Sequence, residues 1–299
     1  MSSLCTPPAR RLRAALVGLA AALAPVVAGA TPANLFYERT LMSAAGARCG
    51  LFTPSVAAAL LAGGQQARGA ALRAGAAPST LAGVEARARA QAASVACNAP
   101  DLALAAERVR TAFNGYSRMS AMDFPGAFAG WRADRGHPKR VGASWRLSQS
   151  ARIGAAPVTF GIASEGAAAP LLTAVVGSPN AQAAAGARLV VRDATLVATP
   201  YIDTRKAGLS GRVAPRTSAR VFLAMSRMAA PAGLLPAGAL GGAAFRFPDA
   251  AARALEGLDP REAVVLELVF PTRTGERVES TLLEVGDFAA GRAFLAAQS

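Results

Sequence analysis

Residues 100–116, PDLALAAERVRTAFNGY, carry the clearest helical period in this 299-residue chain. The apolar positions of this stretch are Leu102, Ala105, Val109, Ala112, Phe113 and Tyr116. Steps of three or four residues place such side chains on one face of an α-helix. Asn98 and Pro100 favour a helix start here, because proline is tolerated in the first helical turn. We therefore predict an amphipathic helix that opens near Pro100.

Three further helical segments precede this one and are joined by short connections. An apolar stripe runs through Leu35, Met42, Ala45 and Cys49. The second segment opens at an N-cap pair, Thr53-Pro54, and runs towards residue 72, with Gly63-Gly64 as a possible break. The third spans about residues 79–95. Four amphipathic segments indicate a small helical bundle over residues 31–122.

The two cysteines of this bundle are Cys49, at the end of the first helix, and Cys97, at the end of the third. A disulfide between them would close a loop of about 49 residues and contribute about 4 kcal/mol in the chain-entropy model. The alternative is two free buried thiols. No further ligands at matching spacing accompany the pair, so we predict neither a metal site nor a cofactor.

From residue 142 onward, short β-branched or alternating apolar runs replace the helical period. These runs are 143–147, 158–162, 171–176, 189–197 and 221–225, with glycine, proline, serine and asparagine between them. An extended segment at 245–247, a short helix at 249–255, a hairpin of 264–270 with 278–283, and a helix at 288–296 close the chain.

The sequence thus predicts an α+β protein of two domains. Residues 31–122 form the disulfide-linked helical bundle, and residues 142–299 form an antiparallel β-sandwich-like domain with a closing helix. A basic Trp/Arg linker, residues 123–141, connects them.

The closing segment 285–295, VGDFAAGRAFL, resembles the end of the invasion-associated locus B family, which are bacterial periplasmic β-sandwich proteins. Asp287-Phe288-Ala289-Ala290 stands in the place of that family's Gly-Phe-x-x-Ala segment, without the preceding Gly-Phe pair, and the family's cysteines are absent. The resemblance implies an envelope-located, non-enzymatic domain and carries over no functional residue.

Residues 1–30 have the pattern of a secretory signal peptide. Three arginines at positions 10, 11 and 13 precede an apolar run, and Ala28-Gly29-Ala30 supplies the small-residue cleavage pattern before Thr31. The alternative is an uncleaved anchor, but the run is rich in alanine, contains Pro25, and is shorter than the roughly 20 apolar residues that a spanning helix needs. We expect cleavage after Ala30, a periplasmic or secreted product, and no transmembrane segment in the mature chain.

The charge of the chain is strongly positive, at +14. Loss of the three signal-peptide arginines would leave +11. Basic exported proteins tend to bind anionic surfaces, so we expect an anionic envelope polymer, lipid headgroups or a periplasmic protein as the partner. Export argues against nucleic acid.

A cluster of aromatic and basic residues lies between the two predicted domains. Its members are Trp131, Arg132, Arg135, Lys139, Arg140, Trp145 and Arg146. Aromatic faces beside guanidinium groups suit stacking on sugars and pairing with phosphate or carboxylate, so we predict a binding segment. The alternative is that the tryptophans fill the domain junction while the arginines stay solvated.

Groups for acid–base catalysis are few. The single histidine, His137, lies in a basic Gly/Pro segment, and no Gly-x-Ser-x-Gly elbow occurs. Carboxylates gather near the end of the chain: Glu262, Glu267, Glu276, Glu279, Glu284 and Asp287. We expect surface positions for them, with Glu267 and Glu279 facing outward from strands, and a helix cap at Asp287.

We therefore predict no catalytic residue. The sequence leaves enzymatic activity open but favours a non-catalytic envelope protein that binds an anionic component or a partner protein. The alternative is a carboxylate-dependent hydrolase of envelope polymers.

Overall fold

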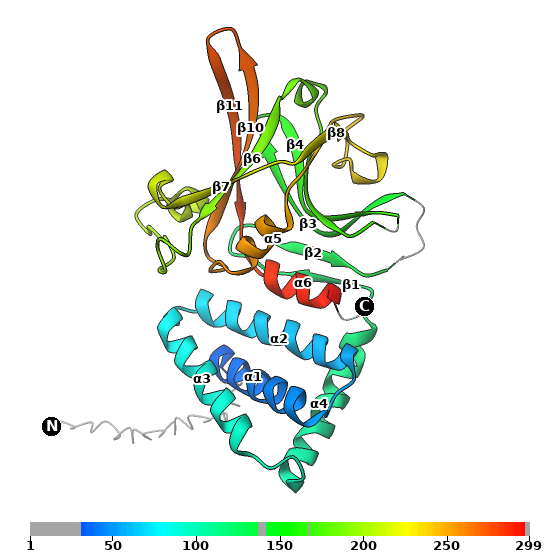
Figure 1. The fold of residues 1–299 in the computed structure, drawn as a ribbon, viewed down its shortest axis with the longest axis vertical. Helices are drawn as coiled ribbons and strands as arrows, with labels where there is room; N and C mark the ends of the chain where they lie inside the picture. The colour runs from blue at the N-terminus through cyan, green and yellow to red at the C-terminus, as the bar shows by residue number, and fades with distance from the viewer. Residues whose placement is uncertain (1–30, 137–141, 167, 297–299) are drawn as a thin grey trace, which may run out of the picture. The chain divides into compact units, whose positions relative to one another are not determined.

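The computed structural model describes residues 31–136, 142–166 and 168–296. The predicted signal peptide therefore lies outside the described residues, as do His137, Lys139 and Arg140. These described residues form one compact unit. Within the compact unit, the helical region is followed by a β region with a closing helix (Figure 1).

The helical region confirms the predicted bundle. Each helix has a proline in its first turn, and the positive φ of Gly50 ends the first helix in a left-handed turn. Gly63-Gly64 does not break the second helix, which is continuous. The helices are α1 (Pro32–Cys49), α2 (Pro54–Arg73), α3 (Pro78–Ser94) and α4 (Pro100–Arg118).

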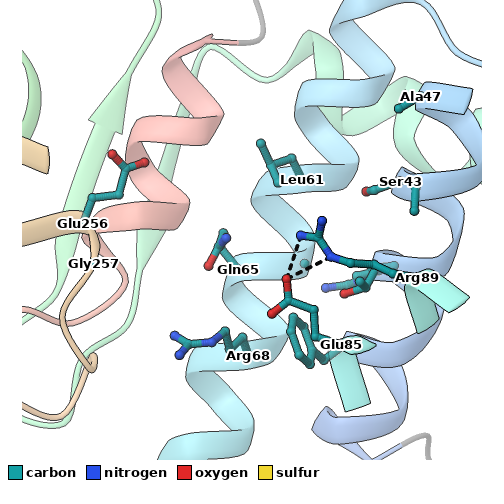
Figure 2. Close-up of a pocket in the computed structure, with 14 residues that line it drawn as sticks. Ser43, Ala47, Leu61, Gln65, Arg68, Glu85, Arg89, Glu256 and Gly257 are labelled. Carbon is teal, nitrogen blue, oxygen red and sulfur yellow. Dashed lines mark hydrogen bonds and ion pairs between the residues drawn. The ribbon is translucent and has the colours of Figure 1, made fainter. Parts of the chain in front are cut away.

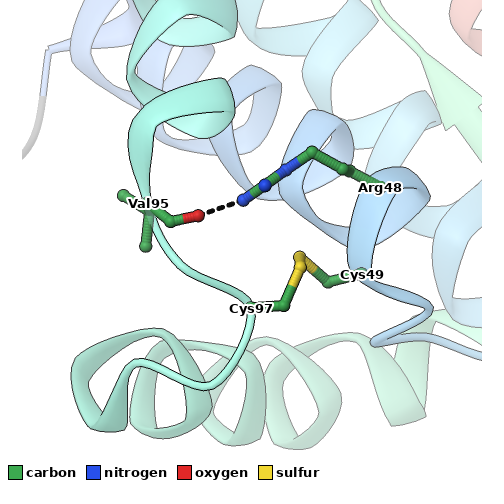
Figure 3. Close-up of a disulfide and its surroundings, with 4 residues drawn as sticks. All are labelled: Arg48, Cys49, Val95 and Cys97. Carbon is green, nitrogen blue, oxygen red and sulfur yellow. Dashed lines mark hydrogen bonds between the residues drawn. A yellow bond between two sulfur atoms is a disulfide. The ribbon is translucent and has the colours of Figure 1, made fainter.

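The disulfide prediction is also confirmed. Cys49 at the end of α1 is bonded to Cys97 in the α3–α4 connection, with 5.5 Å between the Cα atoms (Figure 3). Beside it, the Arg48 guanidinium donates a hydrogen bond to the Val95 carbonyl oxygen. Two adjacent contacts therefore join the end of α1 to the end of α3.

The β region consists of two antiparallel sheets. The larger sheet has the order β1-β2-β3-β4-β5-β9-β8 and the smaller β11-β10-β6-β7. Strands of the larger sheet are β1 (Ala121–Phe124), β2 (Trp131–Asp134), β3 (Ala143–Ile153), β4 (Ala156–Glu165), β5 (Leu171–Val176), β9 (Ala243–Arg246) and β8 (Ser226–Ala229). Strands of the smaller sheet are β11 (Gly275–Glu284), β10 (Ala263–Thr272), β6 (Gly186–Arg192) and β7 (Ala219–Leu223).

One core fills the space between the two sheets. Side chains at alternate positions meet there, including Leu147 and Phe160 from the larger sheet and Leu189, Leu266 and Leu268 from the smaller. All five are at most 1% exposed. The predicted β-sandwich-like architecture follows from this shared core.

The described part of segment 123–141, predicted as a linker, is not a linker. Phe124 pairs with Trp131 in the β1–β2 hairpin, and β2 continues the sheet through its pairing with β3. Four-residue strands give little periodicity, so the apolar positions of this segment did not indicate strands. Its arginines favoured the prediction of a linker instead.

Two short helices, α5 (Asp249–Glu256) and α6 (Phe288–Ala296), complete the β region where the closing pattern predicted them. α6 packs against α2 on one side and against β1 and β2 on another (Figure 1). The helical region is thereby attached to the β region. No helix in the described residues is long and apolar enough to cross a membrane.

Candidate functional site

Trp131, the first member of the predicted binding segment, lies inside the protein. Its side chain is 1% exposed and packs against Phe288 and Phe160, with ring centroids 5.0 and 6.2 Å away. Its indole Nε1 donates a hydrogen bond of 2.8 Å to the Val285 carbonyl oxygen. Trp131 is therefore a core residue and offers no face to a ligand.

Arg135 is buried as well, with 1% of its surface exposed. Its guanidinium lies 3.5 Å from the ring centroid of Phe294 and donates one hydrogen bond, of 2.9 Å, to the Tyr116 carbonyl oxygen. Nε and Nη1 have no hydrogen-bond partner among the described residues. Burial lowers the pKa of this guanidinium. Arg135 joins α4 to α6 and does not face solvent.

The other described members of the segment point in different directions. Arg132 is exposed and pairs with Asp123 at 3.1 Å. Trp145 is half-buried and donates to the Leu234 carbonyl oxygen at 3.1 Å, and Arg146 reaches the Arg135 carbonyl oxygen at 3.5 Å. Neighbours in a strand face opposite sides of the sheet, which is why residues close in sequence form no common surface here.

The predicted surface role of the C-terminal carboxylates is wrong for three of them. Glu262, Glu267 and Glu284 are 1–2% exposed. β10 is covered on its outer side by the segment that follows β6, and Arg216 of that segment forms an ion pair with Glu267. The sequence pattern assumed one solvated face, whereas both faces of this strand are covered.

Each of the other two buried glutamates is held by its own donors. Glu262 binds Arg192 through two hydrogen bonds of 2.6 and 2.9 Å. Glu284 accepts the backbone N–H groups of Ala127, Phe128 and Ala129 at 2.6–2.7 Å. Such carboxylates stabilise loops and strand ends. These two glutamates therefore do not provide the free acid–base pair that a carboxylate-dependent hydrolase would need.

Asp287 occupies the predicted cap position, since its carbonyl oxygen accepts the Gly291 N–H at 2.9 Å. Its carboxylate, however, is buried and binds the Arg73 guanidinium of α2 at 2.8 and 2.9 Å. Burial raises the pKa of this carboxyl, and the Arg73 hydrogen bonds oppose that effect. Gly69 makes this close approach possible, because a Cβ there would overlap the carboxylate.

A groove in the helical region is the more promising site. α1 packs against both α2 and α3 and forms the floor of the groove. The residues of α1 that line the groove are Phe36, Thr40, Ser43 and Ala47, which recur at helical spacing, and Phe36 among them is buried. The volume is about 480 Å³.

We name this groove the arginine groove. Its walls come from α2, α3 and the end of α5. Leu61, Gln65 and Arg68 lie at steps of three or four along α2 and so share one side of it. Figure 2 shows Glu85 and Arg89 of α3 on one side of α2 and Glu256 on the other. The groove therefore combines guanidinium, hydroxyl and amide donors with a few apolar contacts.

Most charges of the arginine groove have partners. Arg89 binds Glu85 at 2.7 Å, and Glu256 binds Arg292 at 3.0 Å. Arg68, in contrast, has no hydrogen bond or ion pair with any described residue. No carboxylate among the described residues pairs with its positive charge.

Arg39 contributes a second guanidinium with spare donors. It donates to the Gly63 carbonyl oxygen at 2.5 Å and lies 5.8 Å from the Phe113 ring centroid. The missing side chain of Gly63 leaves room for it, since a Cβ there would lie 3.3 Å from its Nη1. Burial lowers the pKa of Arg39, so a bound anion would offset a desolvation cost. The glycine pair, interpreted in the sequence as a break, was the available clue.

A second hollow lies at one end of the β-sandwich, with a volume of about 740 Å³. Its apolar wall of Val176, Leu268 and Phe270 is already buried in the core. Its charged residues Arg277 and Glu279 pair with each other. This hollow offers no uncompensated charge, and the described residues contain no group of side chains that could hold a metal ion.

The chain matches no known protein family, no curated protein and no solved structure. The resemblance of residues 285–295 to the invasion-associated locus B family therefore stays a prediction, and the function is argued from the geometry.

Proposed function

We propose that this protein is an exported envelope protein that binds an anionic envelope component, without catalysis, in the arginine groove. The observation that carries the proposal is the guanidinium of Arg68, which lines the groove and has no partner among the described residues. A guanidinium presents five N–H donors in a planar fork that matches carboxylate and phosphate oxygens. An anion would supply the missing acceptors.

Four other residues that line the groove support the same ligand class. Arg39 has unused donors, and Thr40 and Ser43 add hydroxyl groups on the floor. Leu61, which is 49% exposed, adds an apolar contact at the rim. This mixture suits a carboxylated or phosphorylated glycan or lipid headgroup better than a purely apolar ligand.

Export is supported by the signal-peptide pattern of residues 1–30 and by the Cys49–Cys97 disulfide, because disulfides persist in oxidising compartments. The net charge of +11 that remains after loss of the three signal-peptide arginines would concentrate anionic ligands near the protein. Both features fit the periplasm or the cell surface.

Binding can be measured with two anionic probes, each with a neutral counterpart. Polygalacturonate is compared with a neutral polysaccharide by calorimetry, and phosphatidylglycerol vesicles are compared with phosphatidylcholine vesicles by co-sedimentation. We expect one anionic probe to bind and its neutral counterpart not to bind. The affinity should fall as salt rises, since exposed charges are screened over about 8 Å at physiological ionic strength.

Arg68→Ser should weaken binding about tenfold or more, because a hydrogen bond to a charged group contributes about 1.5–3 kcal/mol. Arg108→Ser is the matched control, since Arg108 is exposed on α4, outside the groove. Both variants lose one charge. Equal weakening by the two variants, or no binding of either anionic probe, would contradict the proposal.

A further inference from the structure

One continuous stretch, residues 219–229, forms one edge of each of the two sheets. β7 is the last strand of the smaller sheet and β8 the last strand of the larger, and only Ala224 and Met225 separate them. We name residues 219–229 the shared edge. The strands β7 and β8 have no second neighbour among the described residues.

Besides the exposed arginines Arg220 and Arg227, the shared edge presents several exposed apolar side chains. Val221, Leu223, Met225 and Met228 are 44, 64, 60 and 39% exposed. Proteins normally protect free strand edges with charge, bulges or a cover. The opposite edge of the smaller sheet follows that rule, because β11 begins with Glu276, Arg277 and Glu279. The shared edge therefore exposes more large apolar side chains than the opposite edge of the smaller sheet.

The hydrogen-bond pattern shows which main-chain groups of β7 are free. Ala224 donates to the Ala187 carbonyl oxygen, and Asp193 donates to that of Ser218, both at 2.9 Å. In an antiparallel ladder, residues whose main-chain groups bond to one neighbouring strand alternate with residues whose main-chain groups point away from that strand. Ala219, Val221 and Leu223 therefore direct their N–H and C=O groups away from β6.

We propose that a second copy of this chain docks on the shared edge, with β7 antiparallel to β7 of the partner across a two-fold axis at Val221. In this register Val221 faces its own copy, and Ala219 faces Leu223. All three residues with free main-chain groups then pair with one another, and the two smaller sheets become one continuous sheet.

The charges of β7 permit this register. Arg220 would face Phe222 of the second copy, so no arginine lies opposite another arginine. Head-to-tail pairing with β11 would instead place an apolar edge against a charged one and would build an open chain of copies. In a closed dimer, β7 of one copy pairs with β7 of the other, so the same apolar edge is used by both copies.

The test is sedimentation equilibrium of the full chain over a range of concentrations. We expect a reversible monomer–dimer equilibrium. The dimer should tighten as salt rises, because each copy carries +14 and salt screens their repulsion. A monomer at every concentration, or a dimer that salt dissociates, would overturn the proposal.

Val221→Lys should weaken the dimer about tenfold or more, because two lysines would face each other at the axis. Val278→Lys on β11 is the matched control: Val278 is 43% exposed on the opposite edge of the same sheet, and its substitution should leave the dimer unchanged. Equal effects of the two variants would contradict the assignment.

A second pair of variants tests the register and does not depend on how lysine is tolerated. Val221→Cys should yield a covalent dimer on mild oxidation, whereas Val278→Cys should not, as judged on a non-reducing gel. Covalent dimer from both variants, or from neither, would contradict a two-fold axis at Val221.

Discussion

The helical region and the β region of this protein are stabilised in different ways. In the β region, Trp131 and six phenylalanines are at most 1% exposed and share one core. In the helical region the buried clusters are small and rich in alanine, around Phe36, Leu72 and Leu81 in one and Met42, Leu60 and Leu102 in the other. Alanine buries little area, so each helix contributes less hydrophobic free energy.

The helical region compensates for its smaller core with a covalent link, and it also holds the arginine groove. Both features depend on the same arrangement, in which α1 is flanked by α2 and α3 and the disulfide ties the end of α1 to the segment after α3. The comparison teaches that the candidate site lies in the region with the smaller buried clusters.

Truncating the central aromatic residue of the β region should have the largest effect on stability. Trp131→Ala removes the contacts with Phe160 and Phe288 and leaves the Val285 carbonyl without its donor. We expect the free energy of unfolding to fall by about 3–5 kcal/mol, measured by urea denaturation. A loss below 1 kcal/mol, roughly that of a surface substitution, would show that Trp131 is not a core residue.

Removing the disulfide should have a smaller effect and should act on the other region. In the Cys49→Ala, Cys97→Ala double variant we expect a loss of about 2–4 kcal/mol. Both tryptophans, Trp131 and Trp145, lie in the β region, so their fluorescence reports on that region, whereas far-UV circular dichroism reports mainly on the helices. The dichroism transition should move to lower urea than the fluorescence transition. Coincident shifts would argue that the two regions unfold as one unit.

The sequence predicted the long elements of both regions, because their periods extend over enough residues. The stripe of α4, the Thr53-Pro54 cap and the hairpin of residues 264–283 all lie where expected. β1, β2 and β8 escaped prediction, since four residues carry almost no period.

The candidate site was harder to foresee. Composition drew attention to Trp131 and Arg135, which the fold buries. Arg68 looked like any other surface arginine in the sequence. Only the packing of α1 with α2 and α3 brings Arg68, Arg39 and the Ser43 hydroxyl to one groove. Such a site depends on contacts between helices, which no local pattern records.

The buried guanidinium of Arg135 offers a test at the boundary between the two regions. Arg135→Met keeps a flexible chain on the Phe294 ring and removes a buried charge with two unpaired nitrogen atoms. We expect stability to be unchanged or to rise by about 1 kcal/mol, because such charges cost desolvation energy. A loss of several kcal/mol in urea denaturation would mean that Arg135 has a partner that stabilises its charge.

The smallest expected effect concerns Tyr116 at the same boundary. Its hydroxyl has no partner among the described residues, and burial raises its pKa from 10.0 to about 12. The folded state therefore keeps the proton longer than the unfolded state, so stability should fall as pH rises from 10 towards 12. Tyr116→Phe should remove this fall and the tyrosinate absorbance step near pH 12. An unchanged absorbance titration would contradict the burial of Tyr116.

The central claim is that an anionic ligand occupies the arginine groove and not the segment 131–146. Phenylglyoxal modification of arginines, read by mass spectrometry with and without polygalacturonate or phosphatidylglycerol vesicles, tests it directly. The account predicts that the ligand protects Arg39, Arg68 and Arg89, while Arg132 and Arg146 react as before. Protection of Arg132, Arg140 and Arg146, with Arg68 still reactive, would contradict it and place binding in the segment 131–146.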